Sequence, residues 1–310
     1  MKNYAIFSGS ANPALAAAIA EGLNVPLTPC SVERFPDGEI SVQLEETVRR
    51  REVFIIQPTS PPVNDRLVEL LAFADACRRA DAAHVTAIIP YFGYGRSDRR
   101  AGRREPIMAT MVAGLMQAAG IGHVVTMDIH TPQIEGFFSI PVDDLTATPT
   151  FADALCRDLP EHAVVVAPDL GAVKRATAYS DRLGRPTVIL NKRRRSGSEV
   201  EVSQVIGDVR GRSCIIVDDM ISTGGTIVQA IQALHDEGAD PDITVVATHG
   251  VFTEGARKRL TDAGAGRVIV SDTIPVDAAA WPELHTVSVA PLIATALQRL
   301  AAGESLRSLF

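Results

Sequence analysis

The stretch that decides the fold is Cys214–Ile227, which reads CIIVDDMISTGGTI. Its first apolar residues lead into two carboxylates, Asp218 and Asp219, and a loop rich in hydroxyl groups and glycines follows. Apolar residues then recur at helical spacing. The stretch therefore predicts a strand, a loop and the beginning of a helix, in that order. A helix that begins directly after a loop presents the positive end of its dipole to whatever the loop binds.

The loop carries the groups that hold a phosphate. Its residues are Ser222, Thr223, Gly224, Gly225 and Thr226. They offer hydroxyl groups and several backbone N–H groups, and the glycines allow close approach and positive φ angles. The aspartates would repel a phosphate but would accept hydrogen bonds from vicinal hydroxyl groups. The motif therefore predicts a sugar-phosphate site, with the phosphate in the loop and the ribose hydroxyls on Asp218 and Asp219. The alternative is a solvated turn capped by Asp and Ser.

Length and composition bound the architecture. The chain has 310 residues, 46% of them hydrophobic and 22% charged, which is enough for two α/β domains of ordinary size. Short β-branched runs alternate with helical patterns from end to end, and this alternation predicts mostly parallel sheets flanked by helices on both faces. The two halves are similar in length and rhythm. We therefore expect two similar α/β domains, 1–144 and 145–300, with the tail 301–310 packing on the first.

Charge and cysteine content argue against several classes of protein. A net charge of −7 and a pI near 5.5 disfavour a general nucleic-acid binder. The four cysteines are far apart, so we expect buried free thiols in a reducing compartment, the cytoplasm, and not a zinc site or a disulfide framework.

No signal peptide is expected at the N-terminus. The stretch 107–127 lacks charged residues, yet its polar residues and glycines favour a helix at 106–119 followed by a buried strand at 123–127 over a membrane span.

Two basic clusters stand out from this acidic background. They are Arg96, Arg99, Arg100, Arg103 and Arg104, and Lys192, Arg193, Arg194 and Arg195. Local cations in an acidic protein favour small polyanions such as nucleotides and sugar phosphates, although most such runs are solvated faces. The second cluster precedes a Ser-Gly-Ser segment. It therefore predicts either a mobile arm that closes over phosphates or an exposed loop without a ligand.

Polar residues that follow predicted strands are further candidates, because open α/β sheets bind ligands at the carboxyl ends of their strands. His130 follows the strand at 124–128, Asp169 follows the strand at 163–167, and Arg96 follows the strand at 85–90. Two of them have a structural alternative. His130 could orient a turn, and Asp169 could cap the helix predicted at 171–183.

A turn between two strands is predicted at 34–39, which reads RFPDGE, because Pro-Asp-Gly is a strong turn signal. The turn could be purely structural. It could also bind a nucleotide base, since Phe35 offers a ring for stacking, and Asp37 and Glu39 accept hydrogen bonds from an amino group.

Taken together, six segments resemble the ribose-phosphate diphosphokinases, also called PRPP synthetases, a family with the phosphoribosyltransferase-like fold. The segments are RFPDGE (34–39), PYFGYGRSDRR (90–100), MDIHTPQIEGFF (127–138), APDLGAVKRA (167–176), NKRRR (191–195) and DDMISTGGT (218–226). The resemblance covers essentially the whole chain, including the terminal residues 308–310. Several segments in the same order are far more specific than any one of them.

The resemblance implies a reaction in nucleotide biosynthesis. The β,γ-diphosphoryl group of ATP is transferred to the C1 hydroxyl of ribose 5-phosphate, and AMP is released. The resemblance implies that Ser222–Thr226 hold the 5-phosphate, while Asp218 and Asp219 hold the ribose hydroxyls. For ATP it implies contacts from Phe35, Asp37, Gly38 and Glu39, supplied by a neighbouring subunit, and from Arg96 and Ser97.

The same resemblance implies a metal and an assembly. Mg²⁺ would be bound or positioned by His130 and Asp169, and Lys192 and Arg194 would act in catalysis from the mobile arm, with Arg194 also contacting ribose 5-phosphate. The expected assembly is a homohexamer without nucleic-acid or membrane partners. Two departures stand out. Many relatives carry Gln at the position of Ser97, and many carry Asp-Thr-Ala/Cys-Gly-Thr at 222–226, so that the loop here lacks one carboxylate but keeps its backbone cradle.

Two other functions remain open at this point. A phosphoribosyltransferase shares the 218–226 loop, but the length of the chain, its second α/β half and the segments at 34–39 and 90–100 argue against it. A non-catalytic regulatory subunit would be expected to have lost parts of the arm or of the metal site. Lys192, Arg194, His130 and Asp169 are all present.

Overall fold

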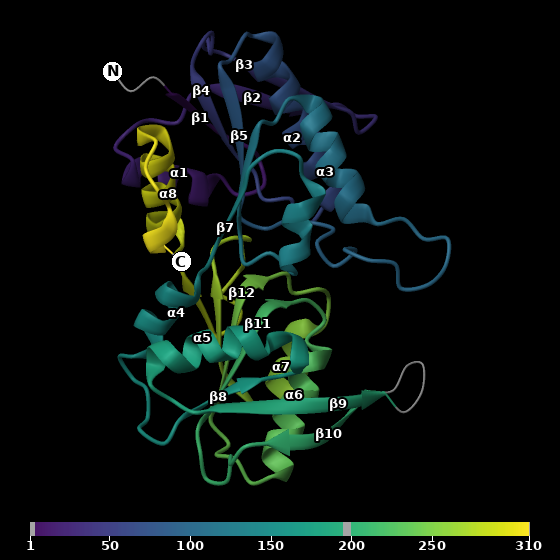
Figure 1. The fold of residues 1–310 in the computed structure, drawn as a ribbon, viewed down its shortest axis with the longest axis vertical. Coiled ribbons are helices and arrows are strands. Elements are labelled where there is room, and N and C mark those ends of the chain that lie inside the picture. Colours follow the sequence, from purple (N-terminus) through teal and green to yellow (C-terminus); the bar gives the residue numbers. More distant parts are fainter. Residues whose placement is uncertain (1–3, 195–199, 310) are drawn as a thin grey trace. The chain divides into compact units, whose positions relative to one another are not determined.

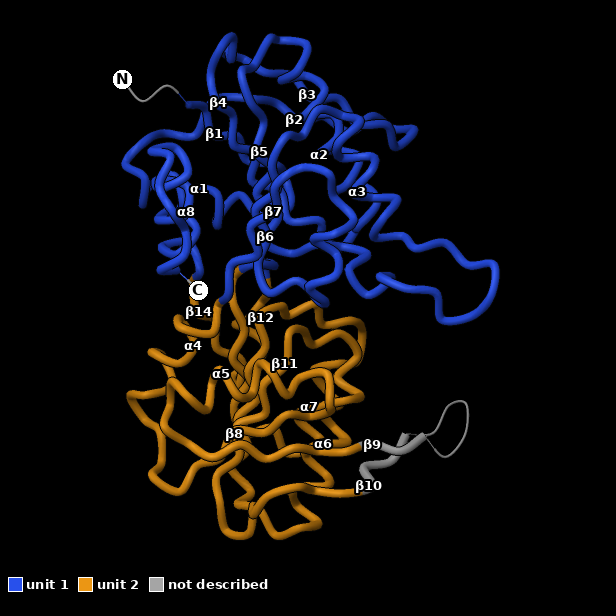
Figure 2. The backbone as a smooth tube through the Cα atoms, viewed as in Figure 1, with its two compact units in different colours: residues 1–146, 273–275, 289–310 blue, residues 147–272, 276–288 orange. Residues whose placement is uncertain are grey.

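The computed structural model describes residues 4–194 and 200–309, which form two compact units (Figure 1, Figure 2). The first unit consists of Met1–Thr146, Thr273–Pro275 and Val289–Phe310, and the second of Ala147–Asp272 and Val276–Ser288. Each unit has its own sheet and its own hydrophobic core. The predicted α/β class, with helices flanking mostly parallel sheets, is confirmed.

The sheet of the first unit is entirely parallel, in the order β1-β4-β5-β6-β7. Its strands are β1 (Tyr4–Ser8), β4 (Glu52–Ile56), β5 (His84–Ile89), β6 (His123–Met127) and β7 (Val142–Leu145). Most of these strands are nearly continuous apolar runs, as expected of strands covered on both faces. Helices α1 (Pro13–Gly22) and α8 (Ala290–Ala302) pack together beside one face, and α2 (Val63–Arg79) and α3 (Met108–Ala119) beside the other (Figure 1). Two 3-10 turns, η1 (Pro132–Phe137) and η3 (Arg307–Leu309), complete the unit.

A separate antiparallel hairpin lies beside this sheet. Its strands are β2 (Cys30–Arg34) and β3 (Ile40–Leu44), and Arg34 pairs with Ile40 next to the turn. The predicted turn at 34–39 is therefore confirmed. A strand before this turn was expected, and the structure gives its bounds, which the short pattern with its polar residues did not define.

The sheet of the second unit has seven strands in the order β10-β9-β8-β11-β12-β13-β14. They are β8 (Val164–Ala167), β9 (Thr187–Arg194), β10 (Val200–Ile206), β11 (Cys214–Ile221), β12 (Ile243–Gly250), β13 (Ala265–Ser271) and β14 (Leu284–Val287). All pairs are parallel except β9 with β10. The flanking helices are α4 (Thr148–Leu155), α5 (Val173–Leu183), α6 (Gly225–Asp236) and α7 (Ala256–Asp262), and η2 (Leu170–Ala172) precedes α5.

The expected domain assignment, which placed residues up to 300 in the second domain, is wrong for helix α8. The helix belongs to the first unit and packs against α1. The two helices approach each other closely at Gly22, where an added Cβ would lie 3.0 Å from the Cβ of Ala294. A residue without a side chain at position 22 therefore helps to bring the end of the chain back to the first unit.

The arm at 191–195 is also corrected in part. The sequence predicts either a mobile arm or an exposed loop here, and in the structure Asn191–Arg194 continue β9 and pair with β10. β-Branched residues of β10, such as Val200, Val202 and Val205, provide the partner strand. Arg195 lies outside the described residues.

Among the residues described, no helix is long and apolar enough to cross a membrane. The stretch 107–127 forms α3, which ends at Gly120 with φ +108°, followed by β6. All four cysteines are free, but only Cys77 and Cys214 are buried, and burial raises the pKa of each thiol to about 12. Cys156 is exposed, contrary to expectation.

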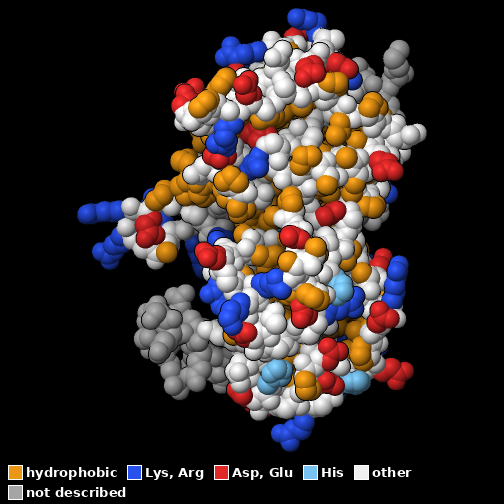
Figure 3. Space-filling view, turned by 180° about the vertical axis from the view of Figure 1, so that it is seen from behind, with side chains coloured by type: hydrophobic (Ala, Val, Ile, Leu, Met, Phe, Trp, Pro, Cys, Tyr) orange, Lys and Arg blue, Asp and Glu red, His pale blue; other side chains and the backbone are white. Residues whose placement is uncertain are grey.

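Acidic and basic side chains are mixed over the face that Figure 3 presents.

Candidate functional site

The predicted strand, loop and helix are present as β11, the segment 222–224 and α6. Strand β11 extends to Ile221, four residues beyond the strand end predicted at Val217, and so includes both aspartates. Its partner β8 pairs only with Cys214–Ile216, whereas β12 accompanies β11 to its end. Asp218 and Asp219 therefore lie where β11 has passed the end of β8, at the carboxyl edge of the sheet.

The loop is held from one side through its carbonyl groups. Ser222 O accepts a hydrogen bond from Thr253 N at 3.0 Å, and Thr223 O accepts one from Arg259 Nε at 2.9 Å. In a trans peptide the N–H group points away from the preceding C=O group. The N–H groups of Thr223 and Gly224 are therefore directed away from these partners. Together with the first turn of α6, whose N–H groups have no partner within the helix, they can form an anion cradle.

Gly224 allows this conformation. It is the N-cap of α6 and has φ +79°, in the region where side chains are disfavoured. A Cβ at this position would also lie 3.3 Å from Cγ of Leu260, which is fully buried. Both the positive φ and the neighbouring side chain therefore favour glycine.

The two aspartates differ in their surroundings. Asp219 is buried. The pKa of Asp218 is raised well above its ordinary value, first because burial disfavours the charged carboxylate, and second because the carboxyl group of Asp219 repels it and shares a hydrogen bond with it. Arg175, whose Nη1 lies 3.8 Å from Asp218 Oδ1, opposes this shift, while Asp169 adds to it. Three carboxylates and one cation thus gather at this edge of the sheet.

Arg175 was not among the candidates predicted from the sequence. It lies in α5, directly after the segment that follows β8. A cation near the start of a helix is unfavourable for the helix dipole, and this was the available signal that the residue serves another purpose.

Asp169 acts as a cap, which was the structural alternative for this residue. Its Oδ1 accepts hydrogen bonds from Gly171 N at 2.9 Å and from Ala172 N at 3.2 Å. Within the described part of the chain, its Oδ2 accepts no hydrogen bond. One carboxylate oxygen is therefore committed to the turn, and the other remains able to bind a ligand.

Lys192 and Arg194 lie near the end of β9, opposite Val202 and Val200 of β10. Their side chains are outside the part of the chain that the structure describes, so their predicted catalytic role stays a prediction.

A large cavity lies in the first unit. Its volume is about 840 Å³, and its wall includes Arg96 and Ser97 together with residues 62–65, Tyr91 and Tyr94. The structure therefore brings Arg96 and Ser97, two of the six residues predicted to contact ATP, to one cavity. The volume falls within the range of roughly 300–1,000 Å³ that is usual for small-molecule sites.

Ser97 also has a structural role. Its Oγ accepts a hydrogen bond from Met108 N at 3.3 Å, and its O accepts one from Ala109 N at 3.1 Å. These two N–H groups are at the start of α3, which has no side-chain cap at Ile107. Ser97 therefore fixes the beginning of the helix beside the cavity.

His130 lies close to the same loop. A Cβ added to Gly95 would be 3.6 Å from the Cβ of His130, and the histidine side chain is exposed. His130 belongs to the first unit and Asp169 to the second. Among the residues described, the structure has no group of three or more His, Cys, Asp or Glu side chains placed to hold a metal ion.

The predicted adenine contacts occupy the tip of the β2–β3 hairpin. Phe35 is 39% exposed, Gly38 has φ +96°, and Asp37 Oδ1 accepts a hydrogen bond from Glu39 N at 3.1 Å. Phe35 N donates to Glu39 O at 2.8 Å and so closes the turn. Of the described residues that line the cavity, none comes from this turn.

Comparison with known proteins gives consistent results over the length of the chain. The family model for the N-terminal domain of ribose phosphate pyrophosphokinase matches residues 4–120, and the model for the phosphoribosyl synthetase-associated domain matches residues 198–310. The chain is 46% identical over 310 residues to a ribose-phosphate pyrophosphokinase of Campylobacter jejuni, with 100% of both chains covered. It is 47% identical over 307 residues to that of Caldanaerobacter subterraneus, covering 98% of this chain and 97% of the relative.

A solved structure agrees with these sequence matches. The crystal structure of phosphoribosylpyrophosphate synthetase from Mycobacterium smegmatis superposes with a TM-score of 0.91 at 39% identity, covering 97% of this chain and 100% of the other.

Proposed function

This chain belongs to the ribose-phosphate pyrophosphokinase family, and we propose that its two units divide the binding of the two substrates of that reaction between them. In the reaction, the C1 hydroxyl oxygen of ribose 5-phosphate attacks the β-phosphorus of ATP. The bond from that phosphorus to the oxygen shared with the α-phosphate breaks, AMP leaves, and the hydroxyl proton is released. The products are PRPP, a precursor in nucleotide biosynthesis, and AMP.

Ribose 5-phosphate is assigned to the second unit. The observation that supports this assignment is that Thr253 and Arg259 bind the carbonyls of Ser222 and Thr223, so that the N–H groups of Thr223 and Gly224 are directed away from those bonds. The 5-phosphate would accept hydrogen bonds from these N–H groups and from the hydroxyl groups of Ser222, Thr223 and Thr226. Asp218 and Asp219 would accept hydrogen bonds from the ribose hydroxyls and so fix the direction of C1.

ATP is assigned to the first unit. Arg96 lines the cavity and would bind the triphosphate, and Ser97 would act mainly by fixing the loop that carries Arg96. Phe35 would stack on adenine, while Asp37, Gly38 and Glu39 would bind its edge, from the same chain or from a neighbouring subunit. Transfer then depends mostly on in-line placement of the reacting oxygen and phosphorus.

Lys192 and Arg194 would supply positive charge to the transferring group, with Arg194 also contacting ribose 5-phosphate. Cations that act mainly on the transition state of phosphoryl transfer are worth about 10³–10⁵ in rate. Such groups have to approach the substrates and withdraw again, and the end of a β-hairpin is suited to that movement.

Mg²⁺ fits the residues present. Magnesium prefers oxygen ligands and keeps several waters, and Asp169 has a carboxylate oxygen that is not used by the turn it caps. Burial and the neighbouring Asp219 raise the pKa of Asp218, and a cation bound near these carboxylates would favour their charged forms. Asp169 would hold the ion, with His130 positioned toward the metal–nucleotide complex. When bound, the ion neutralises charge on the phosphate oxygens.

We further propose a homo-oligomeric enzyme of the cytoplasm, a hexamer by analogy with its family. The four free thiols are compatible with a reducing compartment. Oligomerisation would allow the exposed turn around Phe35 to reach a nucleotide on a neighbouring chain.

The decisive experiment measures AMP release from ATP by the purified protein, with and without ribose 5-phosphate. We expect AMP and PRPP in equal amounts only when both substrates and Mg²⁺ are present. A phosphoribosyltransferase would instead consume PRPP when a base is added, and a non-catalytic subunit would release no AMP. Either of those results would contradict the proposed function.

A further inference from the structure

The first turn of α2 connects the two parts of the proposed ATP site. Residues 62–65 line the cavity. Asn64 accepts a hydrogen bond through Oδ1 from the hydroxyl of Tyr94, which belongs to the cavity loop that also bears Arg96. Asp65 accepts a hydrogen bond through Oδ2 from Nη2 of Arg34, at 2.5 Å. One helical turn thus contacts both the cavity loop and the base of the hairpin.

Arg34 ties the hairpin turn to that helix. It is the last residue of β2 and directly precedes Phe35. Its Nη1 also lies 3.5 Å from the carbonyl oxygen of Gly38, across the turn. The guanidinium group therefore contacts the turn on one side and Asp65 on the other, and so links the turn to the helix.

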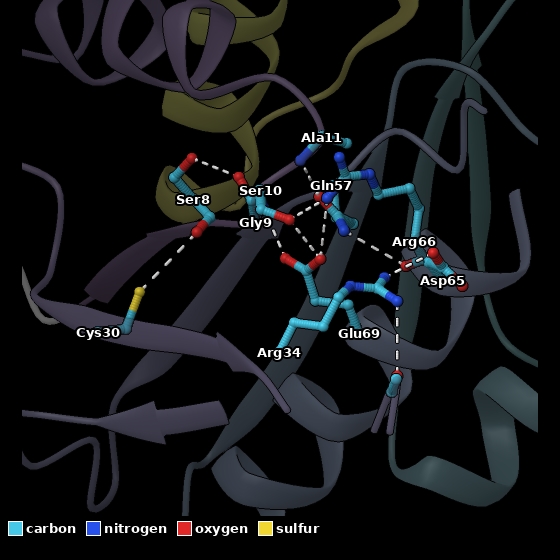
Figure 4. Close-up of polar contacts among 11 residues, drawn as sticks. Ser8, Gly9, Ser10, Ala11, Cys30, Arg34, Gln57, Asp65, Arg66 and Glu69 are labelled. Atoms are coloured by element: carbon cyan, nitrogen blue, oxygen red, sulfur yellow. Dashed lines mark hydrogen bonds and ion pairs between the residues drawn. The ribbon is translucent and has the colours of Figure 1, made fainter. Parts of the chain in front are cut away.

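The helix end that bears Asp65 is itself firmly fixed (Figure 4). Glu69, which is 1% exposed, accepts hydrogen bonds from Ser10 N at 2.6 Å and from Ser10 Oγ at 2.5 Å. Arg66, the residue after Asp65, pairs with Glu69 at 3.3 Å, and its carbonyl oxygen accepts a hydrogen bond from Gln57 Nε2 at 3.3 Å. A buried polar network of this kind holds its members in one arrangement.

We propose that Asp65 is a positioning residue for ATP, which acts through Arg34 to hold the turn 35–39 where that turn meets adenine. The inference rests on the proposed function and adds a residue to its ATP site. It holds whether the turn serves the cavity of its own chain or that of a neighbour, because in both cases the ion pair fixes the turn on the chain that carries it.

The expected effect is moderate and selective. Arg34 and Asp65 are half-exposed, with side chains 50% and 37% exposed. For a pair of this exposure we expect loss of the ion pair to raise KM for ATP by about two- to fivefold. The KM for ribose 5-phosphate should not change, because the pair lies in the first unit and the proposed sugar-phosphate loop in the second.

The test is a double-mutant cycle with a matched control. Asp65→Asn and Arg34→Gln are measured singly and together, and the exchanged pair Arg34→Asp with Asp65→Arg tests rescue. Asp75→Asn is the control, because Asp75 lies on the same helix, has a side chain 36% exposed, and also pairs with arginines, at Arg78 and Arg79. KM for each substrate is measured with the other saturating, and amide exchange is followed over 35–39.

We expect each single variant to raise KM for ATP, the double variant to be no worse than either single variant, and the exchanged pair to recover most of the loss. Amides in 35–39 should exchange faster in Asp65→Asn and unchanged in Asp75→Asn. An unchanged KM for ATP in Asp65→Asn, or an equal rise in Asp75→Asn, would overturn the proposal. If the wild-type protein released no AMP, the proposed function would fail, and the amide exchange alone would still decide whether Asp65 holds the turn.

Discussion

Replacing Gly224 by alanine perturbs the loop at 222–226, which we propose binds the 5-phosphate, at the position where its backbone geometry is most demanding. The residue has φ +79°, and an alanine in the left-handed region costs about 1–2 kcal/mol. The new methyl group would also lie 3.3 Å from Cγ of Leu260, and that side chain is buried and cannot easily move aside. The loop would relieve both by rotating the peptide between Thr223 and Gly224.

That rotation would turn the N–H group of residue 224 away from the phosphate position. If about 1.4 kcal/mol is needed to restore the binding conformation, KM for ribose 5-phosphate rises about tenfold. The KM for ATP, measured with ribose 5-phosphate saturating, should stay close to the wild-type value. The assay is steady-state AMP release with each substrate varied in turn.

Gly238→Ala is the matched control. Gly238 follows the other end of α6 with φ +81°, so alanine there meets the same backbone penalty. Its new methyl group would lie 3.6 Å from Cγ of the Arg210 side chain, an ordinary contact. Both variants should lower the melting temperature, but only Gly224→Ala should raise KM for ribose 5-phosphate. Equal KM values for that substrate in the two variants would refute the assignment of the phosphate to this loop.

Three further predictions concern charge and thiol chemistry. Asp218 has a raised pKa in the folded state, so the folded protein holds a proton that the unfolded chain releases, and the contribution of this group to stability falls as pH rises through the folded pKa. The Asp218→Asn variant should therefore have a higher melting temperature than the wild type in metal-free buffer, and the difference should grow with pH. The same variant should lose ribose 5-phosphate binding. A lower melting temperature at every pH would contradict this prediction. The thiols of Cys77 and Cys214 have a pKa of about 12, so only about 10⁻⁴ of each is ionised at pH 8. An alkylating reagent should therefore modify the exposed Cys156 rapidly, and Cys77 and Cys214 only when the protein unfolds, as measured by mass spectrometry. Lys192→Ala should lower kcat by about 10³–10⁵ while calorimetry still detects ribose 5-phosphate binding, and near-normal turnover would remove Lys192 from the mechanism.

The strand, loop and helix at 214–227 could be predicted because they are contiguous in the sequence. The order of apolar strand, paired carboxylates, glycine loop and helix can be read directly at 214–227, and the structure reproduces it. The turn at 34–39 was predictable for the same reason, since Pro-Asp-Gly specifies a turn through local conformational preferences. Local sequence was therefore sufficient to predict the structure of these two short segments.

Features that depend on distant contacts could not be predicted in this way. The ion pair between Arg34 and Asp65 joins residues 31 positions apart, and no local pattern signals it. The hydroxyl of Ser97 contacts the start of a helix eleven residues later, which gives this residue a structural role beside the predicted contact to ATP. The assignment of α8 to the first unit likewise depends on packing against α1, more than 260 residues earlier in the chain.

The most direct test of the central claim is a crystal structure of the protein with ribose 5-phosphate, Mg²⁺ and a non-hydrolysable ATP analogue. The account predicts the 5-phosphate within hydrogen-bonding distance of the N–H groups of 223–226, the ribose hydroxyls on Asp218 and Asp219, and the nucleotide triphosphate against Arg96. Ribose 5-phosphate bound at another place, with the loop at 222–226 empty, would contradict it.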